Sequence, residues 1–319
     1  MEPQDIAVVI PAFNAARTIR RSIASALAEQ PAEVVVCDDG STDSTPELAR
    51  EAGAIVVTRA NAGPAAARNT GIDLVVGRGR EAVLLLDSDD ELHPGALPAI
   101  ARTARHLPGA ALVLGGHVQV YPDGRTRERL PPGAWCSAGR LHAPALALGT
   151  EAVLCTTGLA LLRPALAGGL RFDPGLVFGE DRDLVYRAGA LGPIAIAARP
   201  LVRKHDEPGR LTANPALGVR WLEDQLRLVA KHAGDPAARA ELARATAWVL
   251  GNTCRVLARG GGRLPASHWS RAADALASLD YPVPARARKW YWVGRLRSSL
   301  AGAGRRTAPA SPPRFQRPV

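Results

Sequence analysis

Two carboxylates follow an apolar run in the first third of the chain. Asp87, Ser88 and Asp89 come directly after Val83–Leu86. Carboxylates one residue apart at the end of a buried strand can converge on one hard cation, and Mg²⁺ typically takes one or two of them together with water or phosphate oxygens. An Asp-x-Asp triplet alone is more often structural than functional. Its position after an apolar run and before Glu91 favours a divalent-metal site.

Polar segments also follow two earlier apolar runs. Pro11-Ala-Phe-Asn14 comes after Ile6–Ile10, and Asp38-Asp-Gly-Ser-Thr-Asp43 comes after Glu33–Cys37. Asp, Asn, Gly and Ser also form ordinary turns and helix caps, which is the simplest explanation of any single segment of this kind. Polar segments after three apolar runs are better explained by a ligand site.

The apolar runs alternate with helical patterns over the first hundred residues. The runs are bounded by turn residues and predict strands, whereas the segments between them repeat apolar residues on one helical face. Ser44-Thr-Pro-Glu47 predicts either a capping box or a proline in the first turn of its helix. The predicted strands are Ile6–Ile10, Glu33–Cys37, Ala54–Thr58 and Ala82–Leu86, and the predicted helices are 15–30, 44–53, 65–76 and 97–107. This alternation predicts an α/β fold with a parallel sheet, in which ligands bind at the carboxyl ends of the strands.

The rest of the chain is expected to be mixed and then helical. Strands are predicted at Leu112–Val120 and Leu201–Lys204, and a helix that begins with acidic residues is predicted at Asp181–Leu191. From Asn214 onward the pattern predicts helices at 217–233, 236–258, 268–279 and 286–300. Four prolines in the last dozen residues predict a disordered end. The predicted organisation is an α/β domain with halves 1–110 and 111–212, a helical basic extension 213–305 and a disordered tail 306–319.

Composition and charge limit the class of protein. The chain has 319 residues, of which 47% are hydrophobic and 22% charged, and this excludes collagen-like, coiled-coil and disordered classes. The net charge of +10 resides in residues 251–319, which carry 13 arginines and lysines and two aspartates. We find no signal peptide and no membrane-spanning run, so we expect a cytoplasmic protein, or one held peripherally at the inner face of the membrane. Widely spaced cysteines predict buried thiols rather than disulfides or a zinc site: Cys37, Cys136, Cys155 and Cys254.

Four segments together resemble the family 2 glycosyltransferases, which are inverting enzymes of the GT-A fold that use nucleotide-sugar donors. They are Val8–Asn14, Val36–Asp43, Asn61–Asn69 and Leu85–Asp90. Phe178–Leu184 is similar to the acceptor motif of that family, which contains a Glu-Asp pair. The resemblance extends over about residues 5–212. It implies a Rossmann-like, mostly parallel sheet flanked by helices, with a nucleotide-sugar-binding first half and an acceptor-binding second half.

The resemblance implies a role for each motif residue. Pro11 and Phe13 would line the nucleotide pocket, although many relatives have Tyr at the position of Phe13. Asp39 would contact the base, most often uracil, with Asp38 beside it. The other implied roles are Arg68 at the donor, Asp87 and Ser88 at the ribose or sugar, Asp89 and Asp87 at a Mn²⁺ or Mg²⁺ ion, and Asp181 as the catalytic base.

The chemistry of glycosyl transfer supports a metal and a base independently. The leaving diphosphate must be neutralised, which a divalent ion can do as a Lewis acid. A second group must take the proton of the acceptor hydroxyl, and a carboxylate within hydrogen-bond reach can do this. Asp181 opens a predicted helix, where the helix dipole favours its ionised form, but an acid in a first turn is usually only a cap. Glu180 and Asp183 are the alternatives for the base.

Two basic residues, His205 and Arg210, follow the last predicted strand. In many relatives a His near the position of His205 approaches the metal or the diphosphate, and a neutral imidazole is a suitable ligand. A solvated surface histidine is an equally good interpretation. Arg210 is either a phosphate clamp or a solvated charge.

Other nucleotide-binding enzymes have less support in the sequence. The first strand is followed neither by the Gly-x-Gly-x-x-Gly of dehydrogenases nor by the Gly-rich basic loop of nucleotidyltransferases, and no P-loop motif occurs. The remaining alternative is a nucleic-acid- or membrane-binding protein that acts through its basic tail and has no transferase activity. Acidic strand ends would repel nucleic-acid phosphates, so we do not expect a nucleic-acid partner.

The basic tail has two interpretations. Trp and Tyr favour the headgroup region of a membrane and cations favour anionic lipid, so the tail could hold the enzyme near a lipid-linked or polysaccharide acceptor. Alternatively, Trp290 and Trp292 pack the tail helices onto the catalytic domain, and the cations are solvated. The residues concerned are Lys289–Arg297 with Arg286, Arg288, Arg305 and Arg306.

Overall fold

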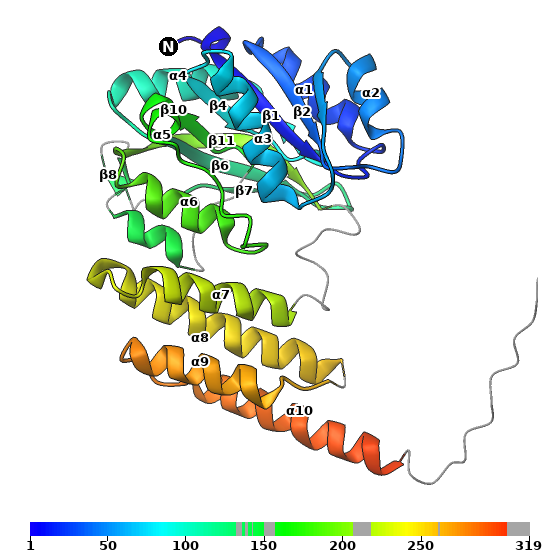
Figure 1. Ribbon diagram of the computed structural model, residues 1–319, viewed down its shortest axis with the longest axis vertical. Helices are drawn as coiled ribbons and strands as arrows, with labels where there is room; N and C mark the ends of the chain where they lie inside the picture. Colours follow the sequence, from blue (N-terminus) through cyan, green and yellow to red (C-terminus); the bar gives the residue numbers. More distant parts are fainter. Residues whose placement is uncertain are drawn as a thin grey trace, which may run out of the picture.

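A computed structural model describes residues 1–131, 136–137, 140–141, 143–149, 157–206, 218–260 and 262–304. Figure 1 shows a twisted sheet with helices packed against it, and a stack of four long helices beyond one side of the sheet domain. The sheet domain comes from the chain up to residue 206, and the stack comes from residue 218 onward.

The first part of the chain forms a parallel half-sheet with the strand order β3-β2-β1-β4. Its elements occur where the sequence predicts them, with ends shifted by a few residues. Ser44 makes no side-chain cap and Pro46 stands in the first turn of α2, so the proline alternative is the correct one. The bounds are β1 (Ile6–Ala12), α1 (Ile19–Ala28), β2 (Glu33–Asp38), α2 (Thr45–Glu51), β3 (Ile55–Thr58), α3 (Pro64–Gly77) and β4 (Ala82–Leu85). The predicted α/β class is confirmed.

The second part of the sheet is mixed. β10 (Ala160–Leu162) runs antiparallel to both β4 and β6 (Leu112–Val120), and β11 (Ile194–His205) runs parallel to β6. The sequence analysis did not predict β10, because three residues carry no periodicity of their own. Since β10 is the reversed strand, β1, β4, β6 and β11 all point the same way. Their carboxyl ends therefore lie along one edge of the sheet.

Short elements complete the sheet domain. β5 pairs with β11, β7 extends β6 as a hairpin, and β9 and β8 add to the other side of β11. The bounds are η1 (Pro3–Asp5), β5 (Glu91–Leu92), α4 (Ala96–His106), β7 (Thr126–Arg129), β8 (Cys136–Ser137), β9 (Arg140–Leu141), η3 (Pro144–Leu148), α5 (Arg163–Ala167) and α6 (Glu180–Ala188).

Apolar side chains cover both faces of the central strands. β1 is buried along its whole length, and its alternate residues point to opposite faces. Ile6 and Val8 belong to the cluster that includes α1 and α4, whereas Val9 belongs to the cluster that includes α3. Gly71 allows α3 to approach closely, because a Cβ at this position would lie 2.4 Å from Val9 Cγ1. The strand ends that carry the polar motifs are thus held by a packed core.

Two of the four cysteines can be assessed in the structure. Cys37 and Cys254 are buried free thiols, as predicted. Burial raises the pKa of each thiol to about 12, so both stay protonated and inert at neutral pH. The Cys136 side chain and Cys155 lie outside the described residues.

The helical stack has its own core and also makes apolar contact with the sheet domain. Leu222, Leu250 and Tyr291 contribute to the core of the stack. Leu228 and Leu148 belong to a second cluster, which joins the stack to the sheet domain. Within the described ranges, no helix is both long and apolar enough to span a bilayer. The bounds are α7 (Gly218–His232), α8 (Pro236–Arg259), α9 (Ala266–Ser278) and α10 (Ala285–Gly304).

The predicted halves 1–110 and 111–212 share one continuous sheet. Their assignment to donor and acceptor stays a prediction. The predicted disordered tail 306–319 and the candidate phosphate ligand Arg210 lie outside the residues that the structure describes.

Candidate active site

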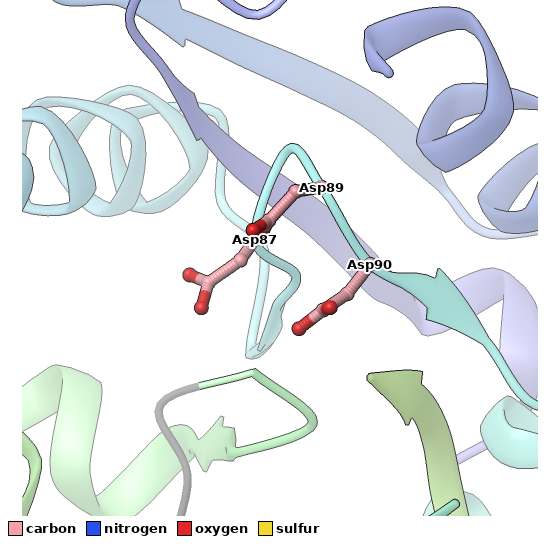
Figure 2. Close-up of side chains that lie close together, drawn as sticks. All are labelled: Asp87, Asp89 and Asp90. Atoms are coloured by element: carbon pink, nitrogen blue, oxygen red, sulfur yellow. The ribbon is translucent and has the colours of Figure 1, made fainter. Parts of the chain in front are cut away.

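Three aspartates gather in the loop after β4, as Figure 2 shows. One carboxylate oxygen from each of Asp87, Asp89 and Asp90 lies within 4.8 Å of the other two. Asp87 and Asp89 are half-buried, and Asp90 is buried. A set of hard anionic oxygens fits Mn²⁺ or Mg²⁺, which prefer oxygen ligands. The predicted pair is therefore joined by a third carboxylate, to which the sequence analysis gave no role.

Helix α1 fixes the backbone of this aspartate loop. Arg21 Nη2 donates to the Asp89 carbonyl at 2.6 Å. Ser22 Oγ lies 2.9 Å from the Ser88 carbonyl and 2.6 Å from the Asp90 carbonyl, which are its acceptors. Sequence reasoning missed both α1 residues. The sequence did contain one indication of this role. Ser22 is a polar residue on the face of α1 that is otherwise apolar and buried.

His205 meets the aspartate loop through its backbone. The His205 N–H donates to Asp90 Oδ1 at 2.9 Å, and the imidazole Nε2 lies 2.8 Å from Glu91 Oε1. Burial and the nearby Arg21 lower the pKa of His205, which favours the neutral imidazole. The structure therefore brings His205 to the edge of the acidic cluster but turns its Nε2 to Glu91.

The loops after β1 and β2 are hydrogen-bonded to each other. Asn14 adopts φ +50°, donates its N–H to Ser41 Oγ at 2.9 Å, and accepts from the Thr42 N–H at 2.9 Å. The Ala15 N–H donates to Thr45 Oγ1 at 2.8 Å. The Asn-Ala and Ser-Thr parts of these motifs therefore position the loops.

The two residues predicted to line the nucleotide pocket differ in exposure. Pro11 is buried in β1, where it pairs with Cys37 of β2. Phe13 follows the strand and is 51% exposed. An exposed aromatic ring at the carboxyl edge of a parallel sheet can stack on a base or a sugar.

Asp38 and Asp39 are both buried but have different surroundings. The Asp39 carboxylate accepts from the N–H groups of Ala62 and Gly63, the shorter bond being 2.7 Å from Gly63 N to Asp39 Oδ2. Asp38 Oδ1 accepts from Ser41 N at 3.2 Å, while the buried Asp38 Oδ2 accepts from no group in the part of the chain that the structure describes. Asp39 thus anchors the start of α3, and Asp38 keeps one acceptor oxygen.

Arg68 of α3 connects the aspartate loop to the start of α6. Its side chain is nearly buried, with the residue 5% exposed. Nη2 donates to Asp87 Oδ1 at 2.9 Å, and Nη1 donates to Glu180 Oε1 at 3.2 Å. Burial disfavours the charged guanidinium, but Asp87 and Glu180 outweigh it and raise the pKa of Arg68. Arg68 therefore stays a cation between two carboxylates.

The three acids at the start of α6 have distinct environments. Burial, followed by the charge of Asp181, raises the pKa of Glu180 to about 7, although Arg68 opposes this. Asp183 is fully buried and accepts from His232 Nε2 at 2.7 Å and from Arg187 Nε at 2.8 Å. Asp181 is half-buried, and its carboxylate accepts only from the Arg182 N–H among the residues described. Asp181 is therefore the carboxylate that is most available to a substrate.

Comparison with known families assigns the chain. Residues 7–167, half of the chain, match the model described as glycosyl transferase family 2. The chain belongs to glycosyl transferase family 2. The match contains β1, β2, Arg68 and the aspartate loop, whereas α6 and the helical stack lie beyond it.

Several proteins related to this family 2 member are known. The succinoglycan biosynthesis protein ExoO of Rhizobium meliloti is 32% identical over 200 residues, which is 59% of this chain and 56% of ExoO. ExoU from the same organism is 48% identical over 106 residues, 30% of this chain and 29% of ExoU. The chain thus matches about half of ExoO and under a third of ExoU.

Solved structures share the GT-A fold and the helical C-terminal region of this family 2 chain. The S. aureus TarS structure of residues 1–349 with UDP-GlcNAc has a TM-score of 0.60 at 16% identity, over 96% of this chain and 92% of TarS 1–349. The mannosyltransferase PcManGT of Pyrobaculum calidifontis, solved with GDP-Man and Mn²⁺, has a TM-score of 0.53 at 19% identity, over 95% and 88%. At these identities the likeness establishes the fold.

The contribution of Asp183 to stability is expected to depend on pH. Burial alone would raise the pKa of Asp183, but hydrogen bonds from His232 and Arg187 lower it from 3.8 to about 2. The ionised carboxylate therefore adds stability above pH 4, and this is lost as the pH falls toward 2. We expect Asp183→Asn to lower the free energy of unfolding by about 2 kcal/mol at pH 7.

Urea unfolding between pH 7 and pH 2 measures this effect. The difference between wild type and Asp183→Asn should shrink as the pH falls below 4. Asp73→Asn is the control, because Asp73 is an exposed partner of Arg171 and its loss should cost under about 1 kcal/mol. A pH-independent difference at Asp183 would contradict the ion-pair role.

Proposed function

We propose that this chain transfers a sugar from a nucleoside-diphosphate sugar to an acceptor hydroxyl, with inversion at the anomeric carbon. The observation that carries the proposal is the acidic cluster at the carboxyl edge of the sheet, joined through Arg68 to the acids that open α6. Family membership supports the same reaction. The carboxyl edge is the place where open α/β sheets bind their ligands.

The donor is proposed to lie over the loops after β1, β2 and β4. Phe13 is proposed to stack on the base, with the Asp38 carboxylate beside the base. Asp39, which the sequence analysis assigned to the base, is engaged with the backbone before α3 and would act by holding that loop. The N–H donor at N3 makes uracil a suitable base, and TarS was solved with UDP-GlcNAc. We therefore favour a UDP-sugar.

The aspartate loop is the proposed diphosphate and metal site. Asp89 and Asp87 are the proposed ligands of Mn²⁺ or Mg²⁺, with Ser88 between them at the sugar and His205 at the edge. When bound, the cation supplies neutralisation of the leaving diphosphate as a Lewis acid. Asp90 would hold the end of β11 against the aspartate loop, because it is buried and its carboxylate accepts from the His205 N–H. PcManGT was solved with Mn²⁺, which supports the choice of metal.

Asp181 is the proposed general base. The acceptor oxygen forms a bond to the anomeric carbon while the bond from that carbon to the diphosphate oxygen breaks, and the acceptor proton passes to the Asp181 carboxylate. Asp183 is unsuitable because His232 and Arg187 occupy its oxygens in the interior. Glu180 is paired with Arg68. Asp181 stands beside Glu180 and is half-buried, so an acceptor hydroxyl can reach its carboxylate.

The proposed acceptor is a saccharide hydroxyl on a growing or lipid-linked glycan. ExoO and ExoU are succinoglycan biosynthesis proteins, which supports polysaccharide assembly as the setting. Helix α10 adds a surface that suits an anionic membrane: Trp292 is 59% exposed and Leu296 is 64% exposed, one helical turn apart. The helix carries Arg and Lys but no acidic residue. Trp290 and Tyr291 instead pack within the stack, so only part of the aromatic cluster serves packing.

We expect Asp89→Asn to abolish most turnover of the donor while the fold persists. An amide cannot supply the anionic oxygen that a hard cation requires. The measurement is UDP release from a panel of nucleotide sugars with Mn²⁺, and EDTA should have the same effect on the wild type. If neither the substitution nor EDTA lowers turnover, the metal assignment is wrong.

Asp181→Asn should leave the affinity for UDP and Mn²⁺ nearly unchanged and lower the transfer rate by about 10²–10⁴-fold, the usual cost of losing a general base. Titration calorimetry with UDP and Mn²⁺ separates binding from turnover. Asp173→Asn, a nearby acid that pairs with Lys231, is the matched control and should retain the wild-type rate. A normal rate in Asp181→Asn would move the base to another residue.

The membrane proposal predicts that full-length protein floats with vesicles rich in anionic lipid and not with neutral vesicles. The double substitution Trp292→Ser and Leu296→Ser should reduce flotation, because these side chains would enter the headgroup region. Leu27→Ser with Leu130→Ser is the control, since both residues are exposed on the sheet domain. Equal flotation of the two double variants would contradict the role of α10.

A further inference from the structure

Helix α7 reaches the segment that precedes the proposed base. Asp224, on α7, is 0% exposed. Its Oδ2 accepts from the N–H groups of Val177 at 3.0 Å and Phe178 at 3.2 Å. These two residues come directly before Gly179, the N-cap of α6, and the helix then begins with Glu180 and Asp181. A carboxylate from a different part of the chain thus holds the turn from which the acidic pair projects.

The turn before α6 contains a glycine in the left-handed region of backbone conformation. Gly179 adopts φ +78°, a conformation that side chains rarely tolerate. A Cβ on Gly179 would lie 2.7 Å from Arg182 Nη2 and 3.0 Å from Leu228 Cδ1, so α7 also packs against the turn. Backbone N–H groups in such a buried turn must be satisfied, and here Asp224 satisfies two of them.

The Asp224 charge is itself compensated by two arginines that touch the same segment. Arg220 Nε donates to Asp224 Oδ2 at 3.0 Å, and Arg227 Nη1 lies 3.4 Å from Asp224 Oδ1. Both arginines also donate to the Gly175 carbonyl. A buried carboxylate is costly unless it is paired and hydrogen-bonded, and this arrangement meets both conditions.

Further contacts connect α6 to the helical stack. Arg182 Nη2 donates to Gln225 Oε1 at 3.1 Å, and Gln225 Nε2 donates to Thr246 Oγ1 of α8 at 3.2 Å. The rings of Phe178 and Trp221 lie with their centroids 5.8 Å apart. The start of α6 is therefore bonded to α7 on several sides, and α7 is bonded to α8.

We propose that α7 is a positioning element of the active site, and that the Asp224 carboxylate sets the direction of Asp181 by holding the turn at Val177–Gly179. The proposal rests on the proposed role of Asp181 as base. Asp224 contacts no reacting atom in this account and acts only through the turn. A misplacement of about 1 Å can cost about 10²-fold in rate, so a positioning contact of this kind matters to the reaction.

Hydrogen exchange tests the contact without any substrate. In Asp224→Ala the Val177 and Phe178 amides lose their acceptor, and we expect the exchange of the peptide over residues 173–181 to accelerate by about tenfold or more. Asp224→Asn keeps one acceptor oxygen but loses the charge, so its exchange should fall between wild type and Asp224→Ala. Glu223→Gln is the matched control, because Glu223 is the adjacent acid on α7 and pairs with His268 of α9 instead.

Kinetics separate positioning from general stability. The probe is the nucleotide sugar that the wild type hydrolyses fastest, with Mn²⁺. We expect Asp224→Ala to lower kcat by about tenfold to a hundredfold with KM and UDP affinity unchanged, and Asp224→Asn to restore part of kcat. If Asp224→Ala does not fold, Asp224→Asn decides alone, with faster exchange over 173–181 and a lower kcat expected.

Wild-type exchange and wild-type kcat in the folded Asp224 variants would overturn the proposal. A loss of UDP affinity that parallels the loss of kcat would also overturn it, because the proposal has Asp224 act on the direction of Asp181 and not on donor binding. Failure of the base assignment is a separate result. It appears as normal turnover in Asp181→Asn, whatever the Asp224 variants do.

Discussion

The buried guanidinium of Arg68 is the interaction on which the site depends most. The carboxyl edge of the sheet concentrates acids, and Asp87 and Glu180 come from segments more than ninety residues apart. Two carboxylates near each other in a low-dielectric environment repel strongly, so one would protonate or the segments would separate. Arg68 offers two N–H groups in a fixed fork and donates one to each carboxylate. It thereby allows the aspartate loop and the start of α6 to approach each other.

Packing and hydrogen bonds hold Arg68 and both of its carboxylate partners in place. Close packing of α3 on β1 at Gly71 places Arg68 at the sheet edge. Helix α1 pins the aspartate loop through Ser22, and helix α7 pins the turn before α6 through Asp224. Among the described residues, the contacts that fix the aspartate loop come from the sheet domain, whereas the turn before α6 is also held by the helical stack. The family match likewise includes the aspartate loop but ends before α6.

The sequence predicted the elements whose pattern is local. The buried strands of the first half, their helices and the polar loops that follow them all carry periodicity or turn residues, and these appear as expected. β10 was missed because a three-residue strand has no period, and it makes the second half of the sheet mixed. Site residues within one motif, such as Asp87 and Asp89, were also accessible to sequence reasoning. Their roles stay predictions.

Contacts between distant segments could not be predicted in this way. Nothing in the local pattern pairs Arg68 with Glu180, or Asp224 with the backbone at Val177, because these contacts depend on how α3, α6 and α7 meet in space. The same holds for Asp183, whose sequence position resembles that of a base but whose partners Lys231 and His232 make it structural. A composition-based view of the tail likewise could not separate the buried Tyr291 from the exposed Trp292.

A double-mutant cycle between Arg68 and Glu180 tests the central claim most directly. The variants are Arg68→Met, Glu180→Gln and the double variant, and the measured quantity is kcat/KM for hydrolysis of the wild type's best nucleotide sugar at pH 8. If the guanidinium joins the aspartate loop to the start of α6, the losses of kcat/KM in the two single variants are not additive, and the coupling energy is at least about 1 kcal/mol. Additive losses within about 0.3 kcal/mol would contradict the account.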